Sequence, residues 1–115
     1  MKTGLTNQRT GKTGEKIAGK FLVSRGFSIL ESNFRTPFGE IDFVAKQDGY
    51  LVFVEVKTRT SERFGSPFSA ITEVKRKHII NNCLYYLKRH GQCDAPCRID
   101  VIGIKLDSLG RVEVL

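Results

Sequence analysis

The sequence predicts a single α/β domain in which helices flank a mixed β-sheet, in the order helix, three strands, helix, two strands. Two observations carry this expectation. Apolar residues alternate with polar ones on both sides of Asp48-Gly49, which indicates a β-hairpin over residues 39–58. Apolar residues also recur at helical spacing once before and once after that hairpin. A chain of 115 residues has the length of one domain with one core.

The chain begins with a segment that lacks apolar periodicity. We expect residues 1–10 to form a loose basic arm and a helix to follow over about residues 13–25. Gly26 then ends the helix, because glycine is common just after a helix. A strand over residues 27–31 and a loop over residues 32–38 lead into the hairpin. The buried stripe of the helix is expected to be Ile17, Ala18, Phe21 and Leu22.

After the hairpin, residues 59–69 form a loop long enough to close over a ligand. A second helix is expected over about residues 72–90. A strand over residues 98–105 should run parallel to the strand that carries Glu55, because a helix is the usual crossover between parallel strands. A short strand over residues 112–115 completes the order. The core face of the second helix is expected to be Ile79, Ile80, Cys83, Leu84, Tyr86 and Leu87.

The dipeptide Asp48-Gly49 is typical of a two-residue hairpin turn, and this turn fixes which residues face each other. Counting outward from the turn puts acids and a lysine on one face, as the pairs Asp42 with Glu55 and Glu40 with Lys57. The other face then holds only apolar pairs: Ile41 with Val56, Phe43 with Val54 and Ala45 with Val52. A shift by one residue would mix charges into the apolar face, so the pattern favours this register.

The facing acids suggest a metal site. Facing side chains on a sheet have Cβ atoms about 4.5 to 5.5 Å apart, so Asp42 and Glu55 can share one divalent ion, and carboxylates suit Mg²⁺ or Mn²⁺. The Val56 carbonyl is a further candidate ligand. Lys57 can orient a nucleophile or neutralise developing charge. The alternative is an ordinary cross-strand ion pair between Glu40 and Lys57; Glu40 is either a ligand or a partner that holds the lysine.

The surroundings of the acids are basic. The chain has a formal net charge of +7, which favours a polyanionic partner such as nucleic acid. An acidic centre within a basic surround is expected where the acids hold a cation and the partner is a phosphate backbone. A solvated charged surface is the alternative. The candidate phosphate contacts are Arg59, Arg63, Lys75, Arg76 and Lys77.

Several motifs together carry a family resemblance: Gly14-Glu15, Asn33-Phe34-Arg35, Gly39-Glu40-Ile41-Asp42, Phe53-Val54-Glu55-Val56-Lys57-Thr58-Arg59 and Phe64-Gly65-Ser66-Pro67. Over nearly the whole chain they resemble the YraN-like family of uncharacterised bacterial proteins. That family looks like a member of the PD-(D/E)xK nuclease superfamily and is closest in layout to archaeal Holliday junction resolvases.

The resemblance implies a restriction-endonuclease-like core and a metal-dependent nuclease that acts on structured or branched DNA. It implies Asp42 and Glu55 as ligands of Mg²⁺ or Mn²⁺ and Lys57 as the catalytic lysine. It also matches Glu15 with an acid on the first helix of resolvase-like members, which makes Glu15 a further metal-site and catalytic candidate. The helix dipole alone favours an acid near a helix start, so Glu15 has a structural explanation too.

Three functions stay open from the sequence: the nuclease, a nucleic-acid-binding protein with the nuclease fold and little or no activity, and a protein-interaction factor with a basic surface. A homodimer is expected if the substrate is a four-way junction, because its resolution uses two symmetric sites. The chain has no apolar run of membrane-spanning length and no signal segment, so we expect a cytoplasmic protein. In that compartment Cys83, Cys93 and Cys97 are expected to be free thiols.

Overall fold

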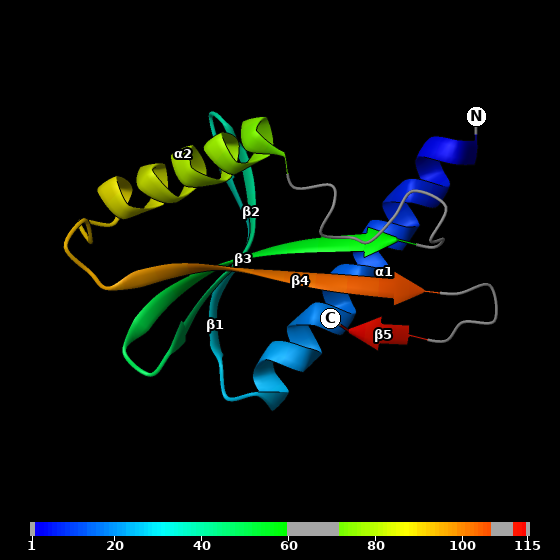
Figure 1. Cartoon of the computed structure of the whole chain (residues 1–115), viewed down its shortest axis with the longest axis horizontal. Helices are drawn as coiled ribbons and strands as arrows, with labels where there is room; N and C mark the ends of the chain where they lie inside the picture. Colours follow the sequence, from blue (N-terminus) through cyan, green and yellow to red (C-terminus); the bar gives the residue numbers. More distant parts are fainter. Residues whose placement is uncertain (1, 60–71, 107–111, 115) are drawn as a thin grey trace.

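In the computed structural model of this chain, residues 2–59, 72–106 and 112–114 are described. This part of the chain forms a five-stranded sheet in the order β1-β2-β3-β4-β5 with two helices (Figure 1). Strands β3 and β4 are parallel, as predicted, and the other neighbours are antiparallel. The predicted class, a mixed sheet with flanking helices as in a restriction-endonuclease-like core, is confirmed. The elements are α1 Lys2–Ser24, β1 Ser28–Thr36, β2 Gly39–Gln47, β3 Tyr50–Arg59, α2 Glu73–Arg89, β4 Cys97–Leu106 and β5 Val112–Val114.

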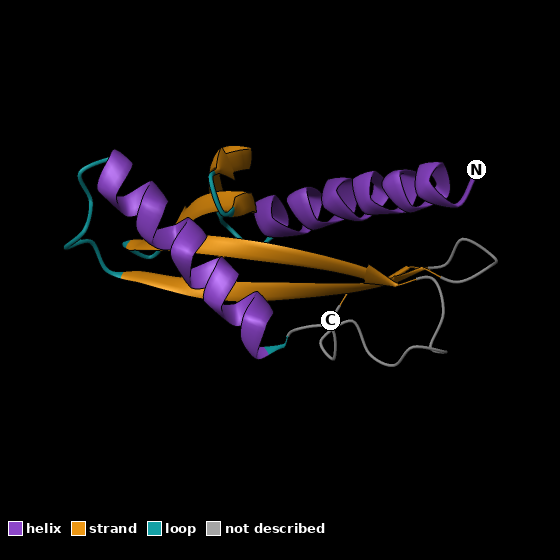
Figure 2. Cartoon of the chain, turned by 90° about the horizontal axis from the view of Figure 1, so that it is seen from above, coloured by secondary structure: helices purple, strands orange, loops and turns teal. Residues whose placement is uncertain are grey.

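The two helices cover opposite faces of strand β3, so the sheet has a core on each side. Val52 and Val54 of β3 belong to the cluster that α1 covers, whereas Leu51 and Phe53 belong to the cluster that α2 covers. This alternation is why β3 reads as a nearly continuous apolar run in the sequence. In Figure 2 the two helices lie apart, and neither packs against the other. In addition to the β3 residues, the α1 cluster contains Ala18, Leu22, Phe43, Ile102 and Ile104, and the α2 cluster contains Ile41, Val44, Cys83, Tyr86 and Leu87.

The β2–β3 hairpin has the predicted turn and, near the turn, the predicted register. Asp48 and Gly49 have φ values of 51° and 82°, which a two-residue hairpin turn of type I′ requires. Facing pairs run from Gln47 with Tyr50 as far as Phe43 with Val54. The ladder ends there. The pairs predicted beyond it, Asp42 with Glu55, Glu40 with Lys57 and Ile41 with Val56, are wrong as ladder pairs.

The end of the ladder coincides with a change of face in β2. Ile41 packs in the α2 cluster and Phe43 in the α1 cluster, although residues two apart on a regular strand share a face. Val56 of β3 packs against the α1 cluster, so Ile41 and Val56 do not share the predicted face. The alternation of β2 therefore breaks at Asp42, where the Asp42 side chain accepts a hydrogen bond from the Val56 amide in place of a ladder contact.

Helix α1 and strand β1 are longer than predicted. Helix α1 begins at Lys2, so the expected loose arm over residues 1–10 is wrong for residues 2–10, and its end stands clear of the strands (Figure 1). Gly4 and Gly11 each lower helix propensity by about 1 kcal/mol but do not forbid a helix, and the segment has no proline. Strand β1 continues to Thr36, so the loop expected over residues 32–38 is much shorter. A register shift between Ile29 and Glu31 hid the alternation of β1.

Helix α2 matches its predicted bounds, with Thr72 as N-cap accepting from the Lys75 amide at 3.2 Å. Its core face is narrower than predicted. Cys83, Tyr86 and Leu87 are buried, but Ile80 and Leu84 are 48% and 49% exposed. Those two lie on a flank of the helix that no described element covers, and the polar Asn82 is buried instead.

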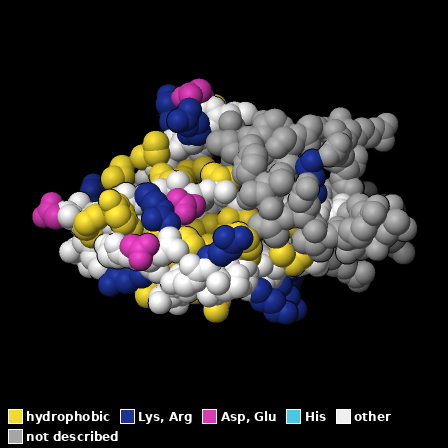
Figure 3. Space-filling model, turned by 60° about the horizontal axis from the view of Figure 1, so that its bottom comes forward, with side chains coloured by type: hydrophobic (Ala, Val, Ile, Leu, Met, Phe, Trp, Pro, Cys, Tyr) yellow, Lys and Arg dark blue, Asp and Glu magenta, His cyan; other side chains and the backbone are white. Residues whose placement is uncertain are grey.

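The remaining predictions for the fold concern the surface and the loop. Most of the loop expected over residues 59–69 lies outside the described residues. All three cysteines are free, as predicted. Among the described helices, none combines the length and apolar character that crossing a bilayer requires. On the face shown in Figure 3, Lys and Arg side chains lie interleaved with exposed hydrophobic ones.

Candidate functional site

The site begins with a close approach between helix α1 and strand β3. A Cβ atom added at Gly14 would overlap the hydroxyl of Thr58, so only glycine lets the helix lie this near to the strand. Gly14 is buried, and the next residue, Glu15, is half-buried. This close contact between Gly14 and the Thr58 side chain brings a carboxylate from α1 to the place where strand β2 leaves its ladder with β3.

Three carboxylates from two elements meet at this place. Glu15 of α1 and Glu40 and Asp42 of β2 each offer an oxygen, and these three oxygens all lie within 4.8 Å of one another. We call these residues the acid cluster. The Asn33 amide, oriented with its nitrogen toward the acids, donates to Glu40 Oε1 and to Glu15 Oε2, each at 3.1 Å. One neutral amide thus ties two acids from different elements together.

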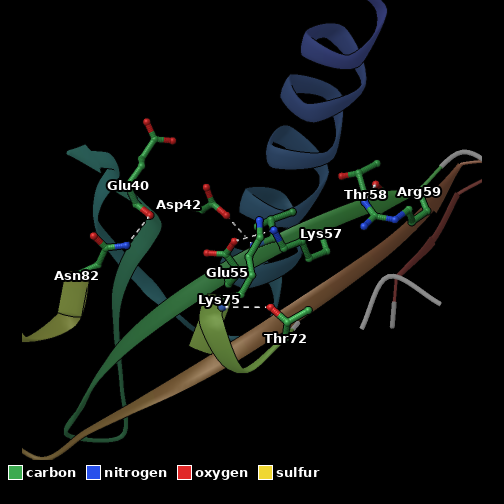
Figure 4. Close-up of polar contacts among 10 residues, drawn as sticks. Glu40, Asp42, Glu55, Lys57, Thr58, Arg59, Thr72, Lys75 and Asn82 are labelled. Atoms are coloured by element: carbon green, nitrogen blue, oxygen red, sulfur yellow. Dashed lines mark hydrogen bonds and ion pairs between the residues drawn. The ribbon is translucent and has the colours of Figure 1, made fainter. Parts of the chain in front are cut away.

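Asp42 lies at the centre of the negative charge. Its Oδ2 accepts a hydrogen bond from the Val56 amide at 2.7 Å, and in Figure 4 its side chain reaches from β2 toward β3. The pKa of Asp42 is raised from 3.8 to about 7. Burial is the largest cause and the charge of the Glu55 carboxylate is the second, whereas the hydrogen bond from the Val56 amide lowers the pKa. Smaller increases come from Glu15 and Glu40.

The pKa of Glu15 is also raised. Burial raises the pKa of Glu15, and the charge of Glu40 raises it too, while the hydrogen bond from Asn33 and the charge of Lys12 lower it. Crowded, partly desolvated carboxylates are unfavourable when all are ionised. A hard cation such as Mg²⁺ or Mn²⁺ removes that repulsion, and carboxylate oxygens are the ligands it prefers. The donor set of the acid cluster therefore fits such an ion.

A cationic group lies beside the acids on strand β3. Lys57 Nζ is 3.3 Å from Glu55 Oε1, and the two side chains are only 15% and 19% exposed. Residues two apart on a strand share a face, which is why the pair forms. Lys75, in the first turn of α2, lies next to this pair. The charge of Lys57 is the largest cause of a lowered pKa of Lys75, and the charge of Glu55 raises that pKa in part. Figure 4 shows Lys57, Glu55 and Lys75 together.

Helix α2 also holds strand β2 at the acid cluster. The side chain of Asn82 is buried and donates to the Glu40 carbonyl at 3.4 Å. The Thr36 hydroxyl donates to the Asn82 carbonyl oxygen, so one amide joins α2 to the last residue of β1 and to β2. Asn82 was missed in the sequence because it interrupts an apolar stripe and reads as a surface residue.

The structure regroups the predicted site residues. Glu15 and Asp42 meet as expected, but they are joined by Glu40, whose role the sequence left open. Glu55 is outside the acid cluster and is engaged by Lys57. Val56 contributes its amide to Asp42, and Glu40 pairs with Arg35 at 3.9 Å instead of with Lys57. The sequence could have indicated that Glu40 joins Asp42, because the two residues lie two apart on one strand.

The predicted phosphate contacts divide into three kinds. Arg59 and Lys75 lie close enough for Arg59 to lower the pKa of Lys75, so both belong to the cationic side of the site. Arg76 is exposed and pairs with Glu73 of its own helix at 3.3 Å. Lys77 is exposed, and Arg63 lies outside the described residues. The site thus consists of an acid cluster flanked by a group of cations.

Comparisons with known proteins agree on one group. The sequence pattern of the family described as "Uncharacterised protein family UPF0102" matches residues 14–104. A UPF0102 protein of Thermodesulfovibrio yellowstonii is 42% identical over 90% of this chain and 91% of its own length. One from Moorella thermoacetica is 42% identical over 94% of this chain and 90% of its own. One from Pelobacter propionicus is 46% identical over 94% of this chain and 79% of its own.

Proposed function

This chain belongs to the uncharacterised protein family UPF0102, and we propose, from the geometry of its site, that it is a divalent-metal-dependent nuclease that hydrolyses phosphodiester bonds in structured or branched DNA. The family membership confirms the predicted resemblance to YraN-like proteins. The family description assigns no activity, so the proposal rests on the residues themselves.

One observation carries the proposal. Three carboxylates within 4.8 Å of one another lie beside a half-buried lysine–glutamate pair, so a site for a hard cation adjoins an ammonium group. A surface ion pair contributes only about 0 to 1 kcal/mol, which gives no reason to bury Asp42 beside other acids, where burial first and the charge of Glu55 second raise its pKa to about 7. The cost is understandable if the cluster serves to bind a cation.

The residues have separate tasks in this proposal. Glu15, Glu40 and Asp42 hold Mg²⁺ or Mn²⁺, and the Val56 amide fixes the orientation of the Asp42 carboxylate. When bound, such an ion polarises a phosphoryl oxygen and lowers the pKa of a water molecule. Lys57 orients the nucleophile or neutralises charge on the phosphate, and Glu55 holds Lys57 in place at 3.3 Å.

The cations around the site supply the polyanion contacts. Lys75 and Arg59 lie on the Lys57 side of the acid cluster, where the phosphates next to the reacting one would lie. Lysines that crowd each other in this way are unfavourable without an anion between them. A nucleic acid strand provides a row of such anions, whereas a small phosphate ester provides one.

The test is a panel of DNA substrates incubated with Mn²⁺ or Mg²⁺: a four-way junction, a flap, a splayed fork, a blunt duplex and a single strand. Wild type should cleave at least one branched substrate, and Lys57→Ala should bind it but cleave it at least about 10²-fold more slowly. Lys88→Ala, which removes the same charge from the other end of α2, is the control and should cleave normally. The proposal fails if wild type cleaves nothing or if Lys57→Ala cleaves as wild type does.

A second function is favoured by one observation. Glu55 is held by Lys57 and is not part of the acid cluster, an arrangement that suits a nucleic-acid-binding protein with little or no catalytic activity. In that case wild type and Lys57→Ala should bind branched DNA equally and neither should cleave it. The same panel therefore separates the two functions.

A further inference from the structure

A groove between helix α1 and strand β1 opens from the acid cluster. Its walls include Glu15 of the cluster and Asn33, the residue that bridges Glu15 and Glu40. From there the groove continues along α1 to Val23 and Ser24, near the end of the helix. The groove is therefore continuous with the proposed metal site, and neither Lys57 nor Lys75 is among the residues that line it.

One wall of this groove is a row of lysines. Lys12, Lys16 and Lys20 all line it, four residues apart along α1. On an α-helix this spacing keeps side chains on one face and about 6 Å apart along the axis, similar to the span of one extended nucleotide. Within the described part of the chain, no ion pair engages Lys16 or Lys20, and both are exposed. The row is thus available to an anion.

The floor of the groove is apolar. Gly19, Val23, Ile29 and Phe43 line it, and Val23 is 60% exposed. A DNA duplex presents phosphates and sugars on its outside, so it makes little use of an apolar floor. An unpaired strand exposes the faces of its bases, and bases bind to apolar and aromatic surfaces in a way that tolerates any sequence. Lysines beside an apolar floor therefore suit an unpaired strand better than a duplex.

We infer that the α1–β1 groove holds an unpaired segment of the nucleic acid strand that passes the acid cluster. The inference rests on the proposed function, because it names the substrate class: DNA with a single-stranded arm at the branch, such as a flap or splayed fork. A second copy of this chain is a poorer occupant. Each copy carries a formal charge of +7, so the lysine row would repel it.

The test measures binding without cleavage. A fluorescently labelled oligothymidylate of about 15 nucleotides and a blunt duplex of matched length are titrated by anisotropy in EDTA at several salt concentrations. Lys16→Ala and Lys20→Ala should each weaken single-strand binding and reduce the slope of log K against log salt by about 0.7. Lys20→Arg should restore the slope. Lys88→Ala, exposed on α2, is the charge-matched control and should bind the single strand like wild type.

A second pair of variants tests the floor. Val23→Ser should weaken single-strand binding without changing the salt slope, because no charge is removed. Val74→Ser is the matched control, since Val74 is 65% exposed on α2 and away from the groove. The inference is overturned if Lys16→Ala and Lys20→Ala bind the single strand like wild type, if Lys88→Ala weakens binding as much, or if the duplex is affected equally.

The outcomes also separate this inference from the proposed function. If the protein binds the single strand through the groove but cleaves no branched substrate, the nuclease proposal fails and the groove inference stands. If it cleaves and loses cleavage in Lys57→Ala, while the groove variants bind normally, only the groove inference fails. Binding of an acidic protein in place of a nucleic acid would appear as no single-strand affinity in wild type, which overturns the inference.

Discussion

The Asp42 carboxylate takes the place of a strand partner, because its Oδ2 accepts the Val56 amide hydrogen at 2.7 Å just where the β2–β3 ladder ends. One carboxylate oxygen satisfies the backbone of β3, and an oxygen of the same residue joins Glu15 and Glu40. The acid cluster thus lies at the point where the β2–β3 ladder ends.

The first prediction concerns pH in metal-free buffer. The folded chain keeps the Asp42 proton up to about pH 7, whereas the unfolded chain releases it near pH 3.8, so between these values the folded state holds more protons. The contribution of Asp42 to stability therefore falls as pH rises through this window. Asp42→Asn removes that fall. The variant should gain stability over wild type from pH 4 to pH 8, by about 1 to 4 kcal/mol, measured by urea unfolding.

A different pH profile would contradict this account of Asp42. Asp48→Asn is the control, because Asp48 lies in the exposed hairpin turn and asparagine tolerates its positive φ of 51°. It should follow wild type at every pH. If Asp42→Asn also follows wild type from pH 4 to pH 8, the Asp42 carboxylate is not buried beside other acids as the structure indicates.

The second prediction concerns the approach of α1 to β3. Gly14→Ala should destabilise the fold by about 1 to 3 kcal/mol, because its methyl group meets the Thr58 hydroxyl. It should also weaken Mn²⁺ binding, since Glu15 moves with the helix. Gly11→Ala is the control: nothing lies within 4 Å of a Cβ at Gly11, and alanine favours a helix by up to about 1 kcal/mol. Equal stability of the two variants in urea would refute the close approach.

The third prediction concerns the link between α2 and β2. Asn82→Ala removes the acceptor of the Thr36 hydroxyl and the donor to the Glu40 carbonyl, and leaves a buried space. It should cost about 1 to 3 kcal/mol in thermal or urea unfolding. Asn81→Ala, the neighbouring exposed position, should stay within about 0.5 kcal/mol of wild type. A small effect at Asn82 would mean that this side chain does not hold Glu40.

The fourth prediction concerns the second lysine. Lys75 lies beside Lys57 and Glu55, so Lys75→Ala should slow cleavage of a branched substrate by about 10-fold or more. Lys77→Ala removes the same charge from an exposed position two residues away on α2 and should change the rate less than twofold, by the usual small effect of exposed sites. Comparable rates for the two variants would show that Lys75 acts only through the overall positive charge.

The sequence was informative where local rules decide the structure. The hairpin turn follows from the preference of Asp-Gly for positive φ, and the bounds of α2 follow from the Thr72 cap. The end of the ladder at Phe43 and Val54 was not predictable, because it coincides with a hydrogen bond that the Val56 amide donates to the Asp42 side chain. A register extrapolated from the turn fails where a side chain replaces a backbone partner.

The candidate site was predicted in part for the same reason. Asp42 and Glu15 meet, but the third member of the cluster is Glu40, because the β2–β3 ladder ends before it would pair Asp42 with Glu55. The lysine row on α1 was not predicted from the sequence, because the candidate phosphate contacts all lie between residues 59 and 77. Lys12, Lys16 and Lys20 become a row only when β1 is known to lie beside that helix.

The most direct test of the central claim is the binding of Mn²⁺ to the acid cluster, followed by electron paramagnetic resonance of the free ion at pH 7.5. Wild type and Asp48→Asn should each bind Mn²⁺ stoichiometrically, and Asp42→Asn should lose that binding while remaining folded. Mn²⁺ binding by Asp42→Asn equal to that of wild type, or no binding by wild type, would contradict the claim that Glu15, Glu40 and Asp42 form a metal site.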